Sequence, residues 1–549
     1  MPTRRDFLLS SAAAVLATAC GARPAPAIPA STRRWDVLIR GGRLLDGTGA
    51  AGRDADIALL DGRIAALGRE AASAAATLEI DVRGHVVAPG FIDIHSHADG
   101  SLSDDPRAES VIRQGITTIV CGQDGSSRGA VHPENEDPDA ETLGRFFDRI
   151  DALPSAVNVA SMIGLGSTRR TVIGNDDREA TPAEIAQMTA IVERALRDGA
   201  CGASSGLEYI PGAFARPDEM SAVCRPLAAR GLPYATHMRN EDDRVLDSIE
   251  EAIAIARGAG CPLQISHLKT QGVRNWPKLD QVFARIERAK AEGLDIAFDR
   301  YPYIAYSTGL TNLFPAWSRE GGNAAFLARL DDPAVAPRIR SETLAKVESI
   351  GGWDNVMITS AGGDADKAAE GARLGSYAAS RNADPYETTV ALLRAGRGSI
   401  GMVGFAMSEE NTARILAHPL GMVCSDGGGF ATEGPARRGH PHPRGLGTFP
   451  RVLGHYVRER RALTLEDAVR KMTSFPASRI GARDRGRLAV GFAGDVVVFD
   501  PNTVADRATF TEPFQYPVGI KAVFVNGVAA LVDGVRSTTG TGKALRIGQ

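Results

Sequence analysis

Five side chains of metal-binding type follow short apolar, β-branched segments: His95, His97, His237, His267 and Asp426. Residues two apart on a strand point to the same face, so His95 and His97 can reach one metal ion together. Neutral imidazole is a usual nitrogen ligand of zinc. If the fold gathers these residues, they predict a divalent-metal site with zinc as the expected metal.

The apolar segments that carry these residues read as strands. The candidates are Val86–His97, Thr117–Cys121, Val157–Gly164, Cys201–Gly206, Pro233–His237, Leu263–His267, Asp295–Tyr301 and Gly421–Ser425. Longer helical stretches separate them, and eight strands alternating with helices favour an α/β fold, a (β/α)8 TIM-like barrel. All strands of such a barrel end at one mouth, where barrel enzymes place their chemistry. We therefore expect the histidines and Asp426 to converge there.

Both ends of the chain contribute short alternating strands separated by Gly-containing turns. These segments predict a small β-sandwich domain built from residues 35–88 and 485–549, with the barrel at 89–484 between them. Residues 304–356 predict a helical insertion after the seventh barrel strand. A further strand-like run lies at Thr388–Met407.

Charge and composition exclude several protein classes. The 549 residues include 63 Lys and Arg against 66 Asp and Glu, a net charge of -3, which argues against an electrostatic nucleic-acid binder. A hydrophobic fraction of 43% argues against a disordered chain. No stretch reaches the about 20 apolar residues that a transmembrane helix needs. We expect a small-molecule partner.

Residues 1–34 have the pattern of an export signal and a linker. Arg4 and Arg5 precede the apolar run Phe7–Ala19, an arrangement that resembles a twin-arginine signal. We therefore expect a periplasmic or secreted protein. Cys20 is a candidate lipid-attachment site, although Leu16 stands one position too early for a good lipobox.

The landmarks along the chain resemble the amidohydrolase superfamily and, within it, the N-acyl-D-amino-acid deacylases (D-aminoacylases). They run from about Trp35 to the C-terminus and read PGFIDIHSH, GITTIVCGQDG, GASSGLEYIPG, YATHMRNE, QISHLK, DRYPY, CSDGG, HPRGLGTFPRVLGHYVRE and RGRLAVGFAGDVVVFDP. The first and last are typical of the superfamily. The middle ones, above all Thr448–Gly454, are more specific to the deacylases.

The resemblance implies a centre of one or two zinc ions, with His95 and His97 on the first and His237 and His267 on the second. Relatives of this kind usually carry a cysteine in the loop after the second strand, whereas GQDG places Asp124 there. A carboxylate can bind or bridge two zinc ions, so we expect Asp124 to be a metal ligand. The alternative is a turn-forming aspartate beside Gly125.

The expected chemistry is hydrolysis of an amide bond. Zinc lowers the pKa of a bound water, and Asp426 would take its proton and return it to the departing nitrogen. The resemblance implies that Lys269, Tyr301 and Arg444 hold the substrate α-carboxylate and that Tyr209 lines the pocket. Considered singly, each is also explained as a surface charge or a packed aromatic ring.

Two other functions remain open at this stage. The first is hydrolysis of cyclic amides or imides, as in dihydropyrimidinase- or dihydroorotase-like enzymes. Those relatives typically carry a lysine on the fourth strand, which here reads CGASSG. The second is a non-catalytic periplasmic binding protein on the same barrel, which loss of a ligand or of Asp426 would favour. The preference for D-amino acids follows from the resemblance alone.

Overall fold

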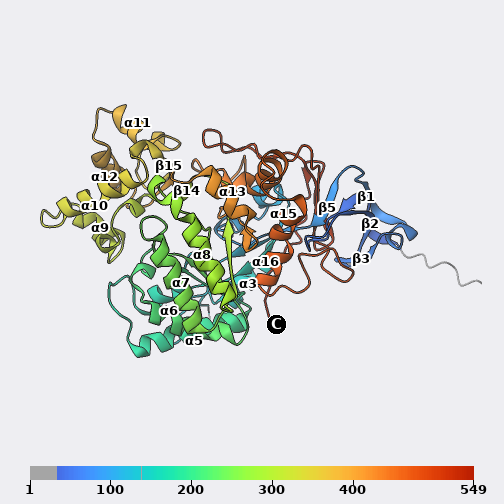
Figure 1. The fold of residues 1–549 in the computed structure, drawn as a ribbon, viewed down its shortest axis with the longest axis horizontal. Coiled ribbons are helices and arrows are strands. Elements are labelled where there is room, and N and C mark those ends of the chain that lie inside the picture. Colours follow the sequence, from blue (N-terminus) through green and yellow to red (C-terminus); the bar gives the residue numbers. More distant parts are fainter. Residues whose placement is uncertain (1–33, 136, 138, 549) are drawn as a thin grey trace, which may run out of the picture.

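The computed structural model describes residues 34–135, 137 and 139–548. The expected export signal and Cys20 lie outside these residues. Three parts can be followed in Figure 1: a sheet domain in blue at one end, a barrel in the middle, and an insertion in yellow at the opposite end. No helix in the described ranges is both long and apolar enough to cross a bilayer.

The barrel is built from parallel strands that follow one another in chain order within the described residues. They are β6 (Phe91–Asp93), β7 (Ile116–Cys121), β8 (Asn158–Ser161) continued by β9 (Ile163–Gly164), β10 (Ala203–Gly206), β11 (Tyr234–His237), β12 (Leu263–Ile265), β13 (Ile296–Arg300) and β17 (Gly421–Val423). A parallel bridge between Ser96 and Gly427 joins the first strand position to the last. This arrangement agrees with the predicted α/β class and its eight strand positions.

Helices surround these strands. They are α1 (Asp99–Leu102), α2 (Glu109–Ile112), α3 (Leu143–Ala152), α4 (Leu165–Val172), α5 (Pro182–Asp198), α6 (Pro217–Ala228), α7 (Val245–Ala259), α8 (Leu279–Ala291), α13 (Glu409–Ala417), α14 (Arg444–Arg451), α15 (Leu465–Met472) and α16 (Ser474–Arg479). In α5, the side chains and backbones of Thr181 and Glu184 cap each other at the start, and Gly199 with φ of 106° ends the helix. Local sequence therefore sets the helix limits.

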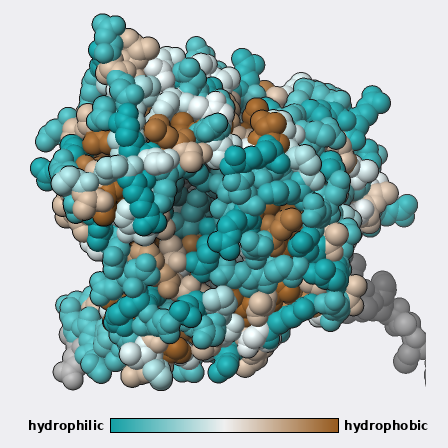
Figure 2. Space-filling model, turned by 60° about the vertical axis from the view of Figure 1, so that its left-hand side comes forward, coloured by the Kyte–Doolittle hydropathy of each residue, from teal (hydrophilic) through white to brown (hydrophobic). Residues whose placement is uncertain are grey.

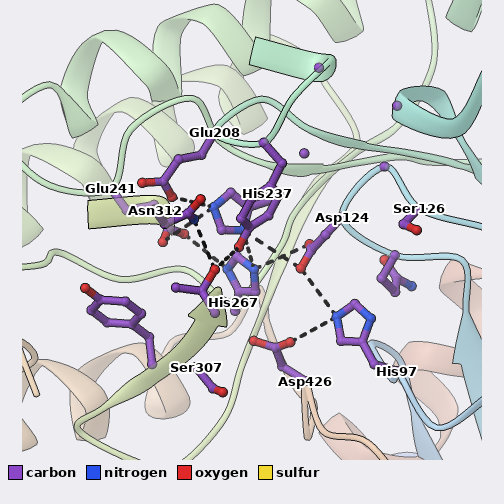
Figure 3. A pocket seen from close by; sticks show the side chains of 18 of the residues that line it. His97, Asp124, Ser126, Glu208, His237, Glu241, His267, Ser307, Asn312 and Asp426 are labelled. Atoms are coloured by element: carbon purple, nitrogen blue, oxygen red, sulfur yellow. Dashed lines mark hydrogen bonds and ion pairs between the residues drawn. The ribbon is translucent and has the colours of Figure 1, made fainter. Parts of the chain in front are cut away.

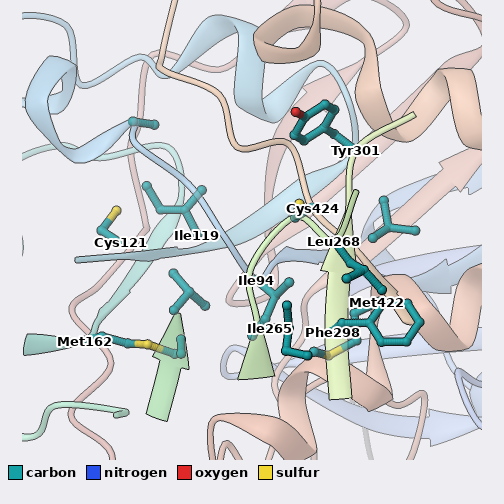
Figure 4. Packing of buried hydrophobic residues seen from close by; sticks show 14 of the residues in the cluster. Ile94, Ile119, Cys121, Met162, Ile265, Leu268, Phe298, Tyr301, Met422 and Cys424 are labelled. Atoms are coloured by element: carbon teal, nitrogen blue, oxygen red, sulfur yellow. The ribbon is translucent and has the colours of Figure 1, made fainter. Parts of the chain in front are cut away.

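Apolar packing between strands and helices fixes the strand ends. Ile119, Ile265 and Phe298 are buried members of one cluster that also includes residues of the surrounding helices (Figure 4). Strands buried on both faces need near-continuous apolar sequence, which is the pattern that made them recognisable.

The sheet domain draws strands from both ends of the chain. They are β1 (Trp35–Leu44), β2 (Arg53–Leu60), β3 (Arg63–Leu67), β4 (Ala76–Asp81), β5 (Val86–Pro89), β18 (Val496–Phe499), β19 (Ile520–Val525), β20 (Val528–Val532) and β21 (Val535–Arg536). β5 pairs with β1 on one side and with β18 on the other. The nine strands form one continuous sheet, and Ile57 and Phe524, from opposite ends of the chain, belong to the same apolar cluster.

Two boundaries differ from those expected. The run Val86–His97 is not one strand, because Gly90 separates β5 in the sheet domain from β6 in the barrel. A Cβ atom at Gly90 would lie 2.3 Å from the side chain of Thr117, so the close approach requires glycine. The last residues also leave the sheet domain: the amide of Leu545 donates to Val159 O on the barrel over 2.8 Å.

The insertion is longer than 304–356 and is not purely helical. It contains β14 (Tyr306–Gly309), α9 (Asn323–Arg329), α10 (Ala336–Ser349), β15 (Val356–Ala361), α11 (Leu374–Ala379), α12 (Pro385–Ala395) and β16 (Ile400–Gly404). Its strands form an antiparallel sheet in the order β14-β16-β15, so the strand-like run at Thr388–Met407 belongs to it. Such pairing joins segments far apart in sequence, which periodicity alone does not reveal.

The surface seen in Figure 2 is mainly hydrophilic and has a hollow near its centre. Its hydrophobic side chains form small separate groups. The exposed large apolar residues of the described chain, such as Val273 and Val535, are likewise scattered. No broad apolar patch on this face calls for a macromolecular partner.

Candidate metal centre and active site

The predicted histidines and Asp426 meet at the carboxyl ends of the barrel strands (Figure 3). His95 and His97 follow β6, His237 ends β11, His267 follows β12 and Asp426 follows β17. His97, His237, His267 and Asp426 line a cavity of about 280 Å³, and His95 is buried behind His97. His95 and His97 lie beyond the strand rather than on it, so strand alternation is not what brings them together; the turn after β6 does.

Asp124 lies between the two histidine pairs. Its Oδ2 atom is 3.4 Å from Nε2 of both His95 and His97, and its Oδ1 atom is 3.4 Å from Nε2 of His267. Its Oδ2 atom is also 3.9 Å from Nδ1 of His237. The carboxylate therefore points at four imidazoles, an arrangement that favours a metal ligand over a turn-forming aspartate.

Asp124 reaches this position through a strained backbone conformation. Asp124 has φ of 51°, a left-handed conformation that is uncommon outside glycine. Its loop passes so close to β10 that a Cβ atom at Gly206 would lie 2.2 Å from Asp124 O. Strained backbone of this kind gathers at functional sites.

Asp426 completes the first group. Its Oδ1 atom lies 3.2 Å from Nε2 of His97 and 3.6 Å from Nε2 of His95. Both ring nitrogens of His95 and Oδ1 of Asp124 are buried and have no hydrogen-bond partner within the described part of the chain. Leaving such atoms unpaired is costly, and a bound cation would satisfy them.

Three clusters of the described residues could hold a metal ion at this mouth: the two that share Asp124, and Glu208 with His237 and Glu241 on the outer side. Of the two that share Asp124, His95, His97, Asp124 and Asp426 form one, and Asp124, His237 and His267 form the other; in each, the donor atoms lie within 4.8 Å of one another. Imidazole nitrogens with carboxylate oxygens are a donor set that zinc accepts. The residues fit a centre of one or two zinc ions, in which Asp124 would be available to both positions.

Three carboxylates that we did not predict contact the histidines. Glu208 Oε2 lies 2.9 Å from His237 Nε2, and Glu241 Oε1 lies 3.1 Å from His267 Nδ1. Asp299 Oδ1 accepts from the amide of His267 over 2.7 Å. They stand inside the landmarks GLEYIPG, YATHMRNE and DRYPY, but nothing in their spacing marked them.

The residues expected to hold an α-carboxylate also border the cavity. Lys269 Nζ lies 2.6 Å from Glu241 Oε1, and the guanidinium of Arg444 stands 4.9 Å from the ring centre of Tyr301. Tyr301 is fully buried, and its hydroxyl has no hydrogen-bond partner among the residues described. Two cations and a free phenol thus share one end of the cavity.

Tyr209 lines the same cavity, as expected. Its ring centre is 4.6 Å from that of His237, and its hydroxyl lies 3.3 Å from Oγ1 of Thr308 on β14. The ring therefore packs against His237, a candidate metal ligand, and reaches the insertion.

Arg444 sets the charge of Asp426. Burial alone would raise the pKa of the Asp426 carboxyl, but the guanidinium of Arg444 and the imidazoles of His95 and His267 outweigh it and hold that pKa well below its usual range. Arg444 Nη1 donates to Asp426 Oδ2 over 2.5 Å. Asp426 is consequently ionised at neutral pH, with Oδ1 left facing the histidines.

Comparison with known proteins gives concordant matches. The model of the Amidohydrolase family matches residues 78–339 and 435–530. The chain is 38% identical over 504 residues to D-aminoacylase of Alcaligenes xylosoxydans xylosoxydans, covering 90% of this chain and 94% of that protein. It is 36% identical over 506 residues to N-acyl-D-glutamate deacylase of the same organism, covering 90% and 93%.

A solved structure is similar over almost the whole chain. It is that of N-acyl-D-glutamate deacylase from Bordetella bronchiseptica, complexed with zinc and a phosphonate inhibitor that mimics the tetrahedral intermediate. The TM-score is 0.78 at 36% identity, and the match covers 94% of this chain and 100% of that one.

Proposed function

The chain belongs to the amidohydrolase family, and from that premise we propose that it hydrolyses the amide bond of N-acyl-D-amino acids, giving a carboxylate and a free D-amino acid. The observation that carries the proposal is the position of Asp124 between two histidine pairs, opposite an ionised Asp426. The preference for D-amino acids rests on the relatives.

Zinc is the proposed cofactor. His95, His97 and Asp124 would hold one ion, with Asp426 beside it, and Asp124, His237 and His267 would hold the other. When bound, zinc supplies polarisation of the substrate carbonyl and acidification of water. The buried ring nitrogens of His95, unpaired within the described residues, support this assignment.

Asp426 is the proposed general base and acid. Arg444 occupies Oδ2, so Oδ1, which faces His97 at 3.2 Å, is the oxygen available to take a proton from the attacking water. The same oxygen then delivers that proton to the departing amide nitrogen. Arg444 keeps the carboxylate both oriented and charged between turnovers.

Lys269, Tyr301 and Arg444 would bind the α-carboxylate. The Tyr301 hydroxyl has no partner to give up among the described residues, and the cationic groups of Lys269 and Arg444 lie 5.8 Å and 4.9 Å from its ring centre. An arginine beside a lysine suits a carboxylate, since both donate charge-assisted hydrogen bonds. This fixes the scissile amide over the metal centre.

The alternatives receive less support. The sequence of β10, ASSG, has no lysine of the kind expected for a cyclic-amide hydrolase. A binding protein would have no need of an ionised Asp426 beside a complete set of metal ligands.

The test uses zinc-loaded protein and a panel of N-acetyl-D-amino acids, their L-enantiomers and cyclic amides. We expect release of acetate and free amine from D-substrates, and a severe loss in the Asp426→Asn protein. If the protein opened the cyclic amides and hydrolysed none of the N-acetyl-amino acids, the proposal would be refuted and the cyclic-amide alternative favoured.

We also propose export through the twin-arginine pattern, supported by Arg4 and Arg5 ahead of the apolar run Phe7–Ala19. Fractionation of cells making the full chain should place the protein outside the cytoplasm, and joint Arg4→Lys and Arg5→Lys substitution should retain it inside. Membrane association that Cys20→Ala abolishes would identify a lipid anchor; release of the unsubstituted protein as free polypeptide would exclude one.

A further inference from the structure

The second histidine pair has carboxylates on the side away from the bridging aspartate. In Figure 3, Glu208 and Glu241 lie on the far side of His237 and His267 from Asp124 and His97. Each imidazole of this pair therefore stands between a carboxylate that faces the metal position and one that does not. Glu208, Glu241 and His237 lie close enough to hold an ion themselves. The two carboxylates do not face the position between Asp124 and the histidines, and their contacts with the ring nitrogens give them a role as partners of the imidazoles.

Glu208 determines which nitrogen of His237 is free to bind metal. Its Oε2 atom lies 2.9 Å from Nε2 of His237, at hydrogen-bond distance. When Nε2 carries the proton and donates it to Glu208, the lone pair is left on Nδ1, the nitrogen that faces Asp124 at 3.9 Å and His267 at 2.9 Å. The bond also fixes the plane of the ring.

Glu208 is in turn held by the insertion. Lys346, near the end of α10, places Nζ 3.8 Å from Oε1 of Glu208 and 2.6 Å from Oδ2 of Asp242. Arg319, also from the insertion, donates through Nη2 to the backbone oxygen of Glu208 over 3.2 Å. Both the side chain and the backbone of Glu208 are therefore attached to the same inserted segment.

The first histidine pair is attached to the insertion less directly, because Arg444, which donates to Asp426, also donates through Nη2 to the backbone oxygen of Ser307 over 3.4 Å. The ion pairs described for His95 and His97 are with Asp124, Asp299 and Asp426, which all belong to the barrel. A change at Lys346 would thus act on the carboxylate beside His237 and not on the carboxylates that face His95 and His97.

We propose that Glu208 is a positioning residue for the second metal ion, and that Lys346 couples the insertion to the occupancy of that ion. The inference rests on the proposed zinc-dependent function. It adds that the zinc affinity of one of the two metal positions is set separately from that of the other. Neither side chain needs to touch the substrate for this role.

The experiment measures how many zinc ions each variant binds and how tightly it binds them. Wild-type protein, Glu208→Ala, Glu208→Gln and Lys346→Met are loaded with zinc, equilibrated at fixed free zinc in chelator buffers, and assayed by elemental analysis. Glu342→Gln, on the same helix as Lys346 but bonded to Trp317 and Arg338, is the matched control.

We expect two zinc ions in the wild type and weaker binding of one of them, by about 10–100-fold, in Glu208→Ala. Glu208→Gln keeps a hydrogen-bond acceptor and should recover much of that loss. Lys346→Met should weaken the same ion by a smaller factor, and Glu342→Gln should behave as wild type. Retention of one tightly bound ion shows that a variant has folded.

Three results would overturn the inference: wild-type protein that binds fewer than two ions, Glu208→Ala that binds both as the wild type does, or equal weakening of both ions. If Glu208→Ala fails to fold, Lys346→Met decides by the same criteria. Zinc counting uses no substrate, so two-zinc protein without deacylase activity would refute only the proposed function.

Discussion

Asp93 and Ser425 are joined by two hydrogen bonds across the seam of the barrel. The amide of Ser425 donates to Asp93 Oδ1 over 2.8 Å, and its hydroxyl donates to Oδ2. Asp93 ends β6 and Ser425 follows β17, so the pair ties the first strand to the last. His95 comes two residues after Asp93 and Asp426 comes directly after Ser425, so both depend on the seam for their positions.

Loss of this pair should destabilise the fold. Asp93→Ala leaves the buried amide and hydroxyl of Ser425 without an acceptor, which should lower the free energy of unfolding by about 1–3 kcal/mol. Urea denaturation measures the change. Asp104→Ala, at an exposed carboxylate, is the control and should stay within about 0.5 kcal/mol of wild type. Equal stability of the two variants would contradict a structural role for the seam.

Asp426→Asn should abolish most of the turnover while keeping substrate binding. An amide cannot take the proton from water, so kcat should fall by about 10²–10⁴ while KM changes little. Steady-state kinetics on the D-amino-acid substrate turned over fastest provide the measurement. A fall confined to KM would mean that Asp426 binds substrate and does not transfer protons.

Tyr301→Phe should separate substrate binding from stability. The hydroxyl is buried without a partner among the described residues, so its removal should leave the free energy of unfolding unchanged or slightly raised. KM should rise by roughly 10-fold for N-acyl-D-amino acids. It should not rise for the corresponding α-carboxamides, which lack the carboxylate; an equal rise for both substrates would argue against the assigned contact.

Removal of metal should inactivate the protein reversibly. Asp124→Ala should weaken the binding of both zinc ions, because the carboxylate faces both histidine pairs. Chelation should also lower the thermal midpoint, since a ligand present at 100 times its Kd stabilises the fold by about 2.7 kcal/mol. Zinc content and thermal denaturation are read together. Loss of a single ion in Asp124→Ala would show that the carboxylate does not bridge.

The contribution of the α5 cap to the free energy of unfolding should decrease in acid. The guanidinium of Arg178 and the amide of Thr181 lower the pKa of Glu184 to about 2. A carboxyl whose pKa is lower in the folded state stabilises the fold above pH 4.5, and that contribution disappears as the pH falls towards 2. Glu184→Ala should therefore cost about 1 kcal/mol at pH 7 and progressively less between pH 4.5 and 2. Glu193→Gln, at an exposed position of the same helix, is the control; a cost that does not vary with pH would contradict the assignment.

The sequence was sufficient to predict the strands of the barrel and the convergence of the candidate ligands at their ends. Each ligand follows an apolar segment that must be buried on both faces, so His237 and Asp426 could be placed without knowing any contact. Asp124 could be placed by its loop after the second strand, although the loop itself has no periodic pattern.

The contacts around the ligands could not be predicted in the same way. Glu208 meets His237 only because β10 and β11 lie side by side, and Lys346 reaches both Glu208 and Asp242 from a helix more than a hundred residues away. Such contacts depend on tertiary packing that leaves no local pattern. The antiparallel sheet of the insertion was missed for the same reason, and Gly90 divides a continuous apolar run without altering its hydrophobicity.

The place of β5 has a consequence for synthesis of the protein. β5 pairs with β1, made shortly before it, and with β18, made some four hundred residues later. Until β18 emerges from the ribosome, one edge of β5 presents unpaired backbone groups while the whole barrel is being made behind it. A chain that ends before residue 496 should therefore keep an unpaired strand edge that promotes aggregation. The growing polypeptide would need a chaperone to cover that edge until β18 is made.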